Sequence, residues 1–503
     1  MVGVKGDRAL LDRRTGVCTL CSYNAETALK STGTHGTMAM TMDVKGKRVL
    51  VVGLGKSGVA SAQFLAARGA RVTVSDTRSQ NELKTQIPVL LDRGIAVETG
   101  GHGERTFRDQ DLIVVSPGVA SDLPQLVRAR AQGIPVIGEV EIAARFLRGK
   151  IVAITGSNGK TTTTTLCGEL IASSSQRTLV GGNIGTPAIL LVDDSTEDTI
   201  NVIEVSSFQL ETIETFHPHI AVVLNITPDH LDRHGSMEGY TAAKARIFEN
   251  QTSSDYSVLN LDDAGSAGLK SRTKARVCWF TRKQQLSGEQ LGSFVRDGEI
   301  YWRDGKREEK IMPSSEIPLK GAHNLENVLA AVAVGRLCGC DAVSIRTSVS
   351  KFRAVEHRLQ YIATVGGVEY YNDSKATNVD ATIKAIESFA GNIHLILGGK
   401  DKGSDYTLMN SLLRERVKRV YTIGAAAEKI RSHVQSAVEV VPCKTLDTAV
   451  ERAHDLAGSG DVVLLAPACS SFDQFENYEH RGRTFRALVE RLAAPAAAGL
   501  ERR

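Results

Sequence analysis

The sequence predicts an α/β protein of three successive domains, and three observations lead to this prediction. The chain has 503 residues, a length typical of about three domains. Short runs such as RVLVV (48–52), KIVAIT (150–155) and DVVLLAP (461–467) are almost wholly apolar, as in strands that helices cover on both faces. Gly, Ser, Thr or Asn follows many such runs, and a helical pattern comes next. This alternation is typical of doubly wound parallel sheets.

Composition excludes several classes of protein. Hydrophobic residues make up 42% and charged residues 23% of the chain, which are ordinary globular values. The net charge of +4 and the 5% of aromatic residues provide no basic patch interleaved with stacking rings, so we expect no nucleic-acid partner. No apolar run approaches the roughly 18 residues of a membrane span. The eight cysteines suggest reduced thiols, so we expect a cytoplasmic protein, by default a monomer.

Changes of composition and pattern place the domain boundaries. Residues 1–41 lack helix and strand periodicity, and we expect either a disordered tail or a mis-assigned start, with translation beginning near Met42. Residues 278–306 indicate antiparallel strands, and 355–378 indicate a hairpin that opens a new series of strands and helices. The expected domains are a Rossmann-like N-terminal domain at 42–147, a central P-loop ATPase-type α/β domain at 148–351 and a Rossmann-like C-terminal domain at 352–503.

A phosphate-binding loop opens the second domain. In TGSNGKTT an apolar strand leads through a glycine turn to Lys160 and Thr161 at a helix start. Backbone amides of such a turn point at phosphate oxygens, the lysine reaches the outer phosphates, and the threonine hydroxyl suits Mg²⁺. The full P-loop pattern has glycine where Ile154 stands, so this loop is a shorter variety. Its expected ATP-binding residues are Gly156, Ser157, Asn158, Gly159, Lys160, Thr161 and Thr162.

A second glycine motif, GLGKSG (53–58), opens the first domain. Its glycines let the backbone approach a diphosphate, and Asp76, after the next strand, could bind a ribose. The bare pattern suits NAD and other nucleotide diphosphates equally. Because the chain also has a nucleotide loop at 156–162, ATP together with a nucleotide-tagged substrate is the favoured interpretation. An NAD(P)-dependent dehydrogenase is the alternative from another class.

Further motifs follow in order along the chain: EVSSFQLE, NITPDHLDRH, YTAAKARIF, HNLEN, NDSKATN, LGGKDKGSD and PACSSFDQFENYEHRG. With these motifs the chain resembles the Mur ligases, ATP-dependent amino-acid-adding enzymes of peptidoglycan synthesis, from Met42 to about Leu492. SSFQLE, NDSKATN and PACSSFDQF are similar to the motifs of members that add D-glutamate. The resemblance implies that D-glutamate is joined to UDP-N-acetylmuramoyl-L-alanine through an acyl phosphate, with ADP and phosphate as products.

The resemblance also implies roles for individual residues. The catalytic set would be Lys160, Glu204, His230 and Lys244. Two Mg²⁺ ions would be held by Thr161, Glu204, His230 and Lys244, with Lys244 carbamylated. Beyond the loop, ATP would contact Asn324, Asn327, Arg358 and Asp373. The UDP-linked substrate would contact Leu54, Gly55, Lys56, Ser57, Asp76, Thr77, Arg78, Ser116, Pro117, Gly118, Asn183 and Ser206. D-Glutamate would contact Lys375, Thr377, Lys402, Ser471, Phe472 and Tyr478.

Several alternatives stay open at this point. By pattern alone Lys244 is a solvent-exposed lysine on a helix, His230 is a structural histidine, and Asn324 caps the helix that it begins. Lys400 competes with Lys402 for the role in the amino-acid site. For the whole chain, the alternatives are a folylpolyglutamate synthase, a Mur ligase that adds L-alanine or diaminopimelate, and a nucleotide-binding module without catalysis.

Overall fold

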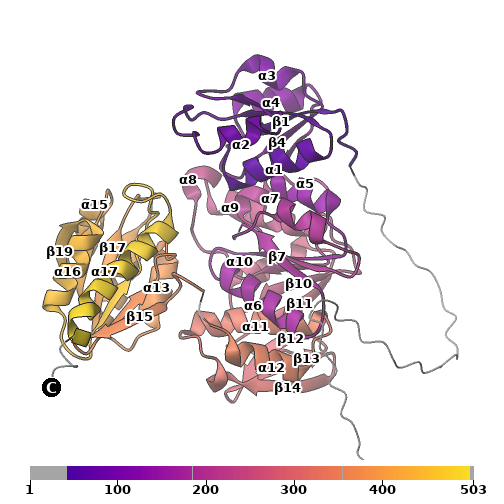
Figure 1. The fold of residues 1–503 in the computed structure, drawn as a ribbon. Helices are drawn as coiled ribbons and strands as arrows, with labels where there is room; N and C mark the ends of the chain where they lie inside the picture. Colours follow the sequence, from indigo (N-terminus) through magenta and orange to yellow (C-terminus); the bar gives the residue numbers. More distant parts are fainter. Residues whose placement is uncertain (1–41, 184, 354, 499–503) are drawn as a thin grey trace, which may run out of the picture. The chain divides into compact units, whose positions relative to one another are not determined.

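Three sheets organise the computed structural model, which describes residues 42–183, 185–353 and 355–498 (Figure 1). The sheets contain five, nine and six strands in chain order. The predicted α/β class is confirmed, because most neighbouring strands are parallel and helices connect them. The prediction for residues 1–41 lies outside the described residues, and the domain boundaries stay predictions.

The first sheet is parallel throughout, with the strand order β3-β2-β1-β4-β5. Its strands are β1 (Arg48–Val52), β2 (Arg71–Ser75), β3 (Ala96–Glu98), β4 (Leu112–Val115) and β5 (Val136–Gly138). The helices of this part are α1 (Lys56–Ala67), α2 (Ile87–Leu91), α3 (Glu104–Arg108), α4 (Pro124–Ala131) and α5 (Glu139–Phe146). Val49 and Val51 pack on the side of α1, and Leu50 and Val52 on the side of α3 and α4, since successive strand residues face opposite ways. The strand order reverses between β1 and β4, where doubly wound sheets bind their ligands.

The second sheet has the strand order β14-β13-β12-β11-β10-β9-β6-β8-β7. Its strands are β6 (Lys150–Thr155), β7 (Thr178–Gly182), β8 (Ile200–Glu204), β9 (Ile220–Val223), β10 (Tyr256–Asn260), β11 (Arg276–Thr281), β12 (Leu291–Arg296), β13 (Glu299–Asp304) and β14 (Arg307–Pro313). β12 and β13 pair in antiparallel fashion, which confirms antiparallel strands within 278–306, and β13 pairs in the same way with β14, which follows that range. The other pairs are parallel.

The helices of this part cover the two faces of the second sheet. They are α6 (Lys160–Ser173), η1 (Ala188–Asp194), α7 (Ser207–Leu210), α8 (Leu231–His234), α9 (Met237–Ala245), η2 (Arg246–Phe248), α10 (Ala264–Gly268), η3 (Leu269–Arg272), η4 (Ser314–Glu316), α11 (Ala322–Leu337) and α12 (Ala342–Lys351). Val152 and Ile154 of β6 pack with α6, α11 and α12. Ile151 and Ala153 face the other way, into a cluster that also contains residues of β1 and α5. The first two sheets therefore share a hydrophobic core.

The third sheet has the strand order β15-β16-β20-β17-β18-β19. Its strands are β15 (Gln360–Val365), β16 (Val368–Asn372), β17 (Ile393–Gly398), β18 (Val417–Ile423), β19 (Glu439–Lys444) and β20 (Val462–Leu465), and its helices are α13 (Val379–Glu387), η5 (Tyr406–Met409), α14 (Asn410–Arg416), α15 (Ala427–Val434), α16 (Leu446–Leu456) and α17 (Tyr478–Ala498). The antiparallel pair β15 and β16 is the hairpin predicted within 355–378. Figure 1 shows α16 and α17 side by side, where they cover one face, while α13 and α15 cover the other.

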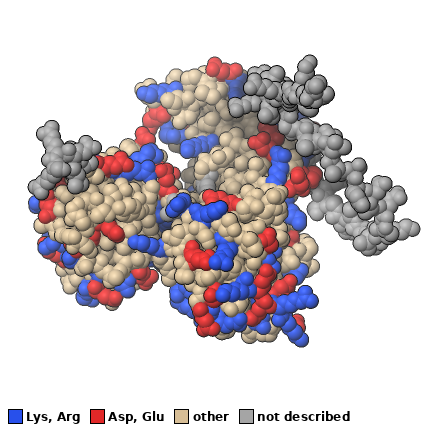
Figure 2. Space-filling view, turned by 60° about the horizontal axis from the view of Figure 1, so that its bottom comes forward, with Lys and Arg blue, Asp and Glu red and all other residues tan. Residues whose placement is uncertain are grey.

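The described surface carries both signs of charge. On the face drawn in Figure 2, lysine and arginine are interspersed with aspartate and glutamate. No helix among the described residues combines the length and the apolar character that crossing a bilayer requires. The six cysteines in the described part of the chain are all free thiols.

Candidate active site

The phosphate loop follows β6, the strand that lies between β8 and β9 in the second sheet. Gly159 caps α6 with a φ of +85°, and a Cβ atom there would stand 2.2 Å from the side-chain oxygen of Asn327. Asn225, just beyond β9, accepts a hydrogen bond from the backbone N–H of Asn158 at 2.8 Å and donates to its carbonyl at 3.1 Å. The loop is therefore held by α11 on one side and by the end of β9 on the other.

Lys160 lies within this loop. Its ammonium donates to the carbonyl oxygens of Gly156 at 2.8 Å and Ser157 at 2.9 Å. Burial lowers the pKa of Lys160, and the carboxylates of Glu204 and Asp229 oppose that shift. The cation is thus held where a phosphate chain along the loop would meet it.

Thr161 and Glu204 form a pair at the ends of adjacent elements. The hydroxyl of Thr161 donates to one carboxylate oxygen of Glu204 at 2.8 Å, and the amide of Asn183 donates to the other at 2.9 Å. Lys375, from the loop after β16, donates to the Thr161 hydroxyl. Burial lowers the pKa of Lys375 to about 8, so its ammonium gives up a proton more readily than an exposed lysine does.

These oxygen donors fit a magnesium nucleotide. Mg²⁺ is commonly bound through one or two carboxylates, with phosphate oxygens and water completing the shell. Thr161 supplies a hydroxyl oxygen and Glu204 a carboxylate for this purpose. No group of three His, Cys, Asp or Glu side chains suited to a metal occurs in the described ranges. The hydroxyl of Thr162 is buried without a hydrogen-bond partner in the described chain, in the first turn of α6, where it could donate a hydrogen bond to a phosphate oxygen.

Asp229 is the centre of a second polar cluster beside the loop. Its carboxylate pairs with Lys402 at 3.1 Å, accepts from the amide of Asn378 at 3.0 Å and lies 3.6 Å from the imidazole of His230. Burial by itself would raise the pKa of Asp229, but Lys402, His230 and Asn378 hold it below its ordinary value. Burial lowers the pKa of His230 to about 4, so the imidazole is neutral at pH 7 and able to bind a metal.

Lys244 is buried, with 1% of its surface exposed, so the pattern-based expectation of an exposed lysine is wrong. It lies near the end of α9, and its ammonium donates to the Gly156 carbonyl at 2.9 Å. Burial and the neighbouring cation of Lys160 lower its pKa well below the ordinary value, while Asp229 and Glu204 offset part of this shift. A neutral amine of this kind can react with CO₂.

One cavity brings the two polar clusters together. We call it the P-loop cavity. It is lined by Ser157, Asn158, Gly159, Lys160, Thr161, Asn183, Gly185, Glu204, Asp229, His230, Arg358, Lys375, Thr377, Asn378, Tyr478 and Glu479. Lys244 does not line it and lies behind the Gly156 carbonyl.

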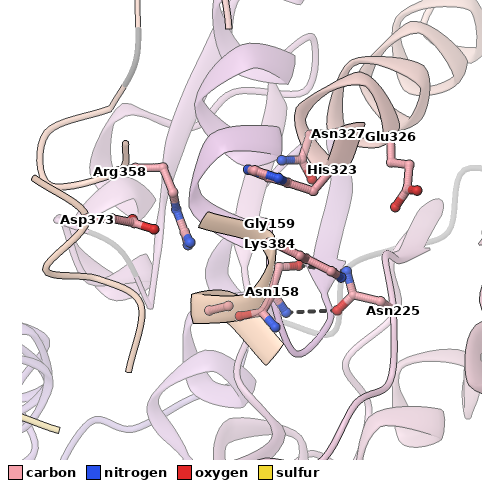
Figure 3. A pocket seen from close by; sticks show the side chains of 10 residues that line it. Asn158, Gly159, Asn225, His323, Glu326, Asn327, Arg358, Asp373 and Lys384 are labelled. Carbon is pink, nitrogen blue, oxygen red and sulfur yellow. Dashed lines mark hydrogen bonds between the residues drawn. The ribbon is translucent and has the colours of Figure 1, made fainter. Parts of the chain in front are cut away.

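A smaller cavity adjoins the P-loop cavity, and we call it the α11 cavity (Figure 3). It is lined by Asn158, Gly159, Asn225, His323, Glu326, Asn327, Arg358, Asp373, Ala381 and Lys384. Figure 3 shows His323, Glu326 and Asn327 extending from one helix, with Arg358 and Asp373 on another side. Burial raises the pKa of Asp373 to about 6, although Arg358 counteracts this.

Asn324 supports the wall of the α11 cavity from behind. Its side-chain oxygen accepts from the amide of Asn327 at 3.1 Å, and its own amide donates to the carbonyl of Lys320 at 2.7 Å. The helix cap is Gly321 rather than Asn324, so the alternative role of Asn324 as the cap is wrong. A cap at Gly321 with a φ of +92° leaves Asn324 in the first helical turn.

The predicted UDP residues of the first domain line one pocket, which we call the β1–β4 pocket. Its lining residues are Gly53, Leu54, Gly55, Lys56, Ser57, Asp76, Thr77, Arg78, His102, Ser116, Pro117, Gly118 and Val119. Asp76 accepts from the backbone N–H of Leu54 at 2.6 Å and from the guanidinium of Arg78 at 2.8 Å. Burial alone would raise the pKa of Asp76, but these bonds from Arg78 and Leu54 lower it. Asp76 therefore shapes the glycine turn as well as facing the pocket.

Four predicted substrate contacts line neither the β1–β4 pocket nor the P-loop cavity: Ser206, Lys402, Ser471 and Phe472. Asn183, predicted to meet the substrate from the second domain, lines the P-loop cavity, and Ser206 caps α7, accepting from the N–H of Gln209 at 3.2 Å. Ser471 is 2% exposed and Phe472 67% exposed, and neither lines the P-loop cavity. Their predicted substrate contacts stay predictions.

Sequence reasoning missed several residues that the fold brings to these cavities. Asp229 directly precedes His230 after a strand, so its position alone could have suggested it. Lys384 and Glu326 lie on helices and gave no local signal. His102 follows two glycines in a loop, and its ring accepts or donates a 2.8 Å hydrogen bond with the hydroxyl of Ser75.

Comparison with known proteins relates the chain to one family. Residues 47–138 match the description "Mur ligase MurD-like, N-terminal domain", 154–335 match "Mur ligase middle domain", and 357–469 match "Mur ligase, glutamate ligase domain". The UDP-N-acetylmuramoylalanine–D-glutamate ligase of Koribacter versatilis is 63% identical over 452 residues, which cover 90% of this chain and 99% of the relative. The enzyme of the same name from Acidobacterium capsulatum is 61% identical over 450 residues, covering 89% of this chain and 97% of the relative.

Solved structures agree at the level of the fold. The UDP-N-acetylmuramate-alanine ligase of Thermotoga maritima superposes with a TM-score of 0.56 at 20% identity, covering 89% of this chain and 100% of its own. A pseudomurein peptide ligase type C from Methanothermus fervidus gives a TM-score of 0.56 at 19% identity, with 89% and 100% covered. From the relatives of high identity and the matches along all three sheets, the chain belongs to the Mur ligase family.

Proposed function

We propose that the chain is an ATP-dependent ligase that joins D-glutamate to UDP-N-acetylmuramoyl-L-alanine in peptidoglycan precursor synthesis. The observation that carries the proposal is the P-loop cavity, where Lys160, Lys375 and the pair of Thr161 and Glu204 meet. The names and the identities of 63% and 61% of the two relatives support D-glutamate over the other amino acids that such ligases add. The same two relatives give no support to the alternative function, an NAD(P)-dependent dehydrogenase.

The reaction must bring together two anions, the alanyl carboxylate and the triphosphate. The carboxylate displaces ADP from the γ-phosphate to give an acyl phosphate. The amine of D-glutamate then attacks the acyl carbon, phosphate leaves, and the amine loses a proton. Lys160, Arg358 and Lys375 all line the P-loop cavity and offset the negative charge that both steps bring together.

Oxygen and nitrogen donors in and behind the P-loop cavity would serve two magnesium ions. Thr161 and Glu204 would hold one, and His230 with a carbamylated Lys244 would help to hold the other. Bound Mg²⁺ supplies positive charge against the phosphate oxygens. Asp229 holds Lys402 and His230 in place with its buried carboxylate.

The three substrates would then occupy adjoining sites. The uridine diphosphate end lies in the β1–β4 pocket, and Asn183 and Ser206 contact the rest of this substrate nearer the P-loop cavity. The base of ATP lies in the α11 cavity against Asn327, with Asn324 behind it. D-Glutamate meets Lys375, Thr377, Lys402, Ser471, Phe472 and Tyr478. Because the reaction consumes ATP and one chain supplies every residue named here, we propose a cytoplasmic enzyme that acts as a monomer.

A phosphate-release assay tests this function. Release from ATP should require both UDP-N-acetylmuramoyl-L-alanine and D-glutamate, and the product should gain the mass of one glutamyl residue. The variant Lys160→Met should lose activity by about 10²-fold or more, because the loop loses its cation. Release with L-glutamate but not D-glutamate would overturn the substrate assignment.

A further inference from the structure

Arg233 contacts the loop that forms one side of the β1–β4 pocket. It lies in α8, three residues after His230. Its guanidinium donates to the carbonyl oxygens of Pro117 at 3.2 Å and Val119 at 3.1 Å, both of which line that pocket. The same group donates to the carboxylate of Glu211 at 2.8 Å. Arg233, from a helix of the second domain, therefore holds one wall of the β1–β4 pocket in the first domain.

The ring of Phe208 connects the guanidinium of Arg233 to the edge of the P-loop cavity. Its central carbon lies 4.2 Å from the ring centre of Phe208. The Phe208 ring in turn lies 4.7 Å from the imidazole of His230, in an edge-to-face arrangement. His230 lines the P-loop cavity. A continuous series of contacts thus runs from the Ser116–Val119 loop to His230.

The geometry of these contacts is specific to arginine. The planar guanidinium offers five N–H groups in a fixed fork, and here it serves two carbonyls and a carboxylate while stacking on a ring. A lysine has a compact ammonium that cannot span these acceptors. The side chains of Arg233 and Glu211 are only 20% and 16% exposed, so solvent screens their ion pair weakly.

We propose that Arg233 is a positioning residue that fixes the Ser116–Val119 loop relative to the ring of His230. This inference rests on the proposed function, in which the UDP end of one substrate occupies the β1–β4 pocket and its alanyl end reaches the P-loop cavity. Arg233 lines neither site. It acts through the backbone of the loop and through Phe208, so its loss should affect both ends of that substrate together.

The test compares Arg233→Lys with a matched variant, Arg416→Lys. Arg416 also donates to two backbone carbonyls, those of Glu387 at 3.1 Å and Phe389 at 2.9 Å, and to the carboxylate of Glu415 at 3.1 Å, but it lines neither cavity and contacts neither Glu211 nor Phe208. For Arg233→Lys we expect the KM of the UDP-linked substrate to rise about tenfold. The Mg²⁺ concentration for half-maximal rate should also rise severalfold, while the KM of D-glutamate changes less than twofold. Arg416→Lys should lower the Tm and leave all three constants within twofold.

Binding of UDP alone, measured by calorimetry without ATP, gives a readout that is independent of catalysis. Arg233→Lys should weaken it severalfold. The inference is overturned if both variants shift the constants equally, if neither does, or if UDP binding weakens while the Mg²⁺ dependence is unchanged. If Arg233→Lys does not fold, Glu211→Gln removes the charge that anchors Arg233 and should move the same constants in the same direction. A wild-type chain that neither binds UDP nor releases phosphate with D-glutamate would instead contradict the proposed function.

Discussion

Lys160 and Lys244 share one hydrogen-bond acceptor, the carbonyl oxygen of Gly156, at 2.8 and 2.9 Å. Two ammonium groups at one carbonyl, in a buried place, repel each other. Burial and the charge of Lys160 together lower the pKa of Lys244, so this arrangement disfavours the charged form of Lys244. Burial also lowers the pKa of Lys160, but the larger shift falls on Lys244, the amine that we propose to be carbamylated.

Replacing Lys244 with alanine should reduce ligase activity by about 10²-fold or more, because the carbamate that we propose as a metal ligand cannot form. A high concentration of a short carboxylic acid should restore part of the activity by supplying oxygen ligands in its place. Steady-state phosphate release measures both effects. Lys270→Ala, an exposed lysine of the same part of the chain, should retain full activity and show no response to the acid. A Lys244→Ala chain with full activity would rule the role out.

Replacing Gly159 with alanine should weaken ATP binding more than tenfold. The new Cβ would lie 2.2 Å from the side-chain oxygen of Asn327, so the loop or α11 must move. Calorimetry with a non-hydrolysable ATP analogue measures the change. Gly403→Ala is the matched control, because Gly403 has a similar φ of +78° but no atom within 4 Å of the new Cβ. That control should cost about 1 kcal/mol of stability and leave ATP affinity unchanged, and equal losses in both variants would show that backbone strain alone is responsible.

Lys402 and Lys400 should differ in their effect on D-glutamate. Lys402 pairs with the buried Asp229 at 3.1 Å, whereas Lys400 is exposed and its backbone groups bond to Ser470. Lys402→Met should raise the KM of D-glutamate more than tenfold, because the site loses a cation beside Asp229. Lys400→Met should change it less than twofold. Initial rates over a range of D-glutamate concentrations measure both, and the reverse ranking would transfer the role to Lys400.

Asp373→Asn should change how stability depends on pH. The pKa of Asp373 is about 6 in the folded chain and 3.8 as the ordinary value, so between these values the folded state binds more protons. The stabilising contribution is therefore complete below about pH 4 and is lost as the pH rises through about 6. A shift of about two units corresponds to roughly 3 kcal/mol.

The asparagine cannot ionise, so Asp373→Asn should gain stability relative to the natural chain as the pH rises from 4 to 7. Urea unfolding at several pH values measures this difference. Asp122→Asn, at an exposed position, should follow the natural chain throughout. A difference that is constant with pH would mean that Asp373 does not titrate in this range.

Local pattern was sufficient for the fold class and for both glycine turns. The apolar runs at 48–52 and 150–155 became β1 and β6, and the turns that follow them line the β1–β4 pocket and the P-loop cavity. Parallel strands carry their following loops to the same edge of a sheet, so residues after β1, β2 and β4 meet although they are far apart in the chain. This is why Leu54 and Asp76, which the glycine motif suggested, and Ser116, which the family resemblance suggested, line one pocket.

Contacts between distant segments could not be predicted from the sequence. Asp229 meets Asn378 and Lys402, which lie 149 and 173 residues further along the chain. Arg233 reaches the loop at Pro117 across 116 residues. No periodicity encodes such pairs, since they depend on which strand ends and helices the packing brings together.

The sequence by itself determined the strands, the two glycine turns and the resemblance to a ligase family, because these depend on neighbouring residues and on the order of motifs. Tertiary structure decided the charge state of the functional groups. The sequence pattern predicts that Lys244 is an exposed lysine on a helix. In the folded chain, α9 packs behind the phosphate loop, and this packing removes water from the Lys244 ammonium. Desolvation and ion pairing act through space, so only the folded chain shows that Lys244 is driven toward its neutral form while Asp229 is held ionised.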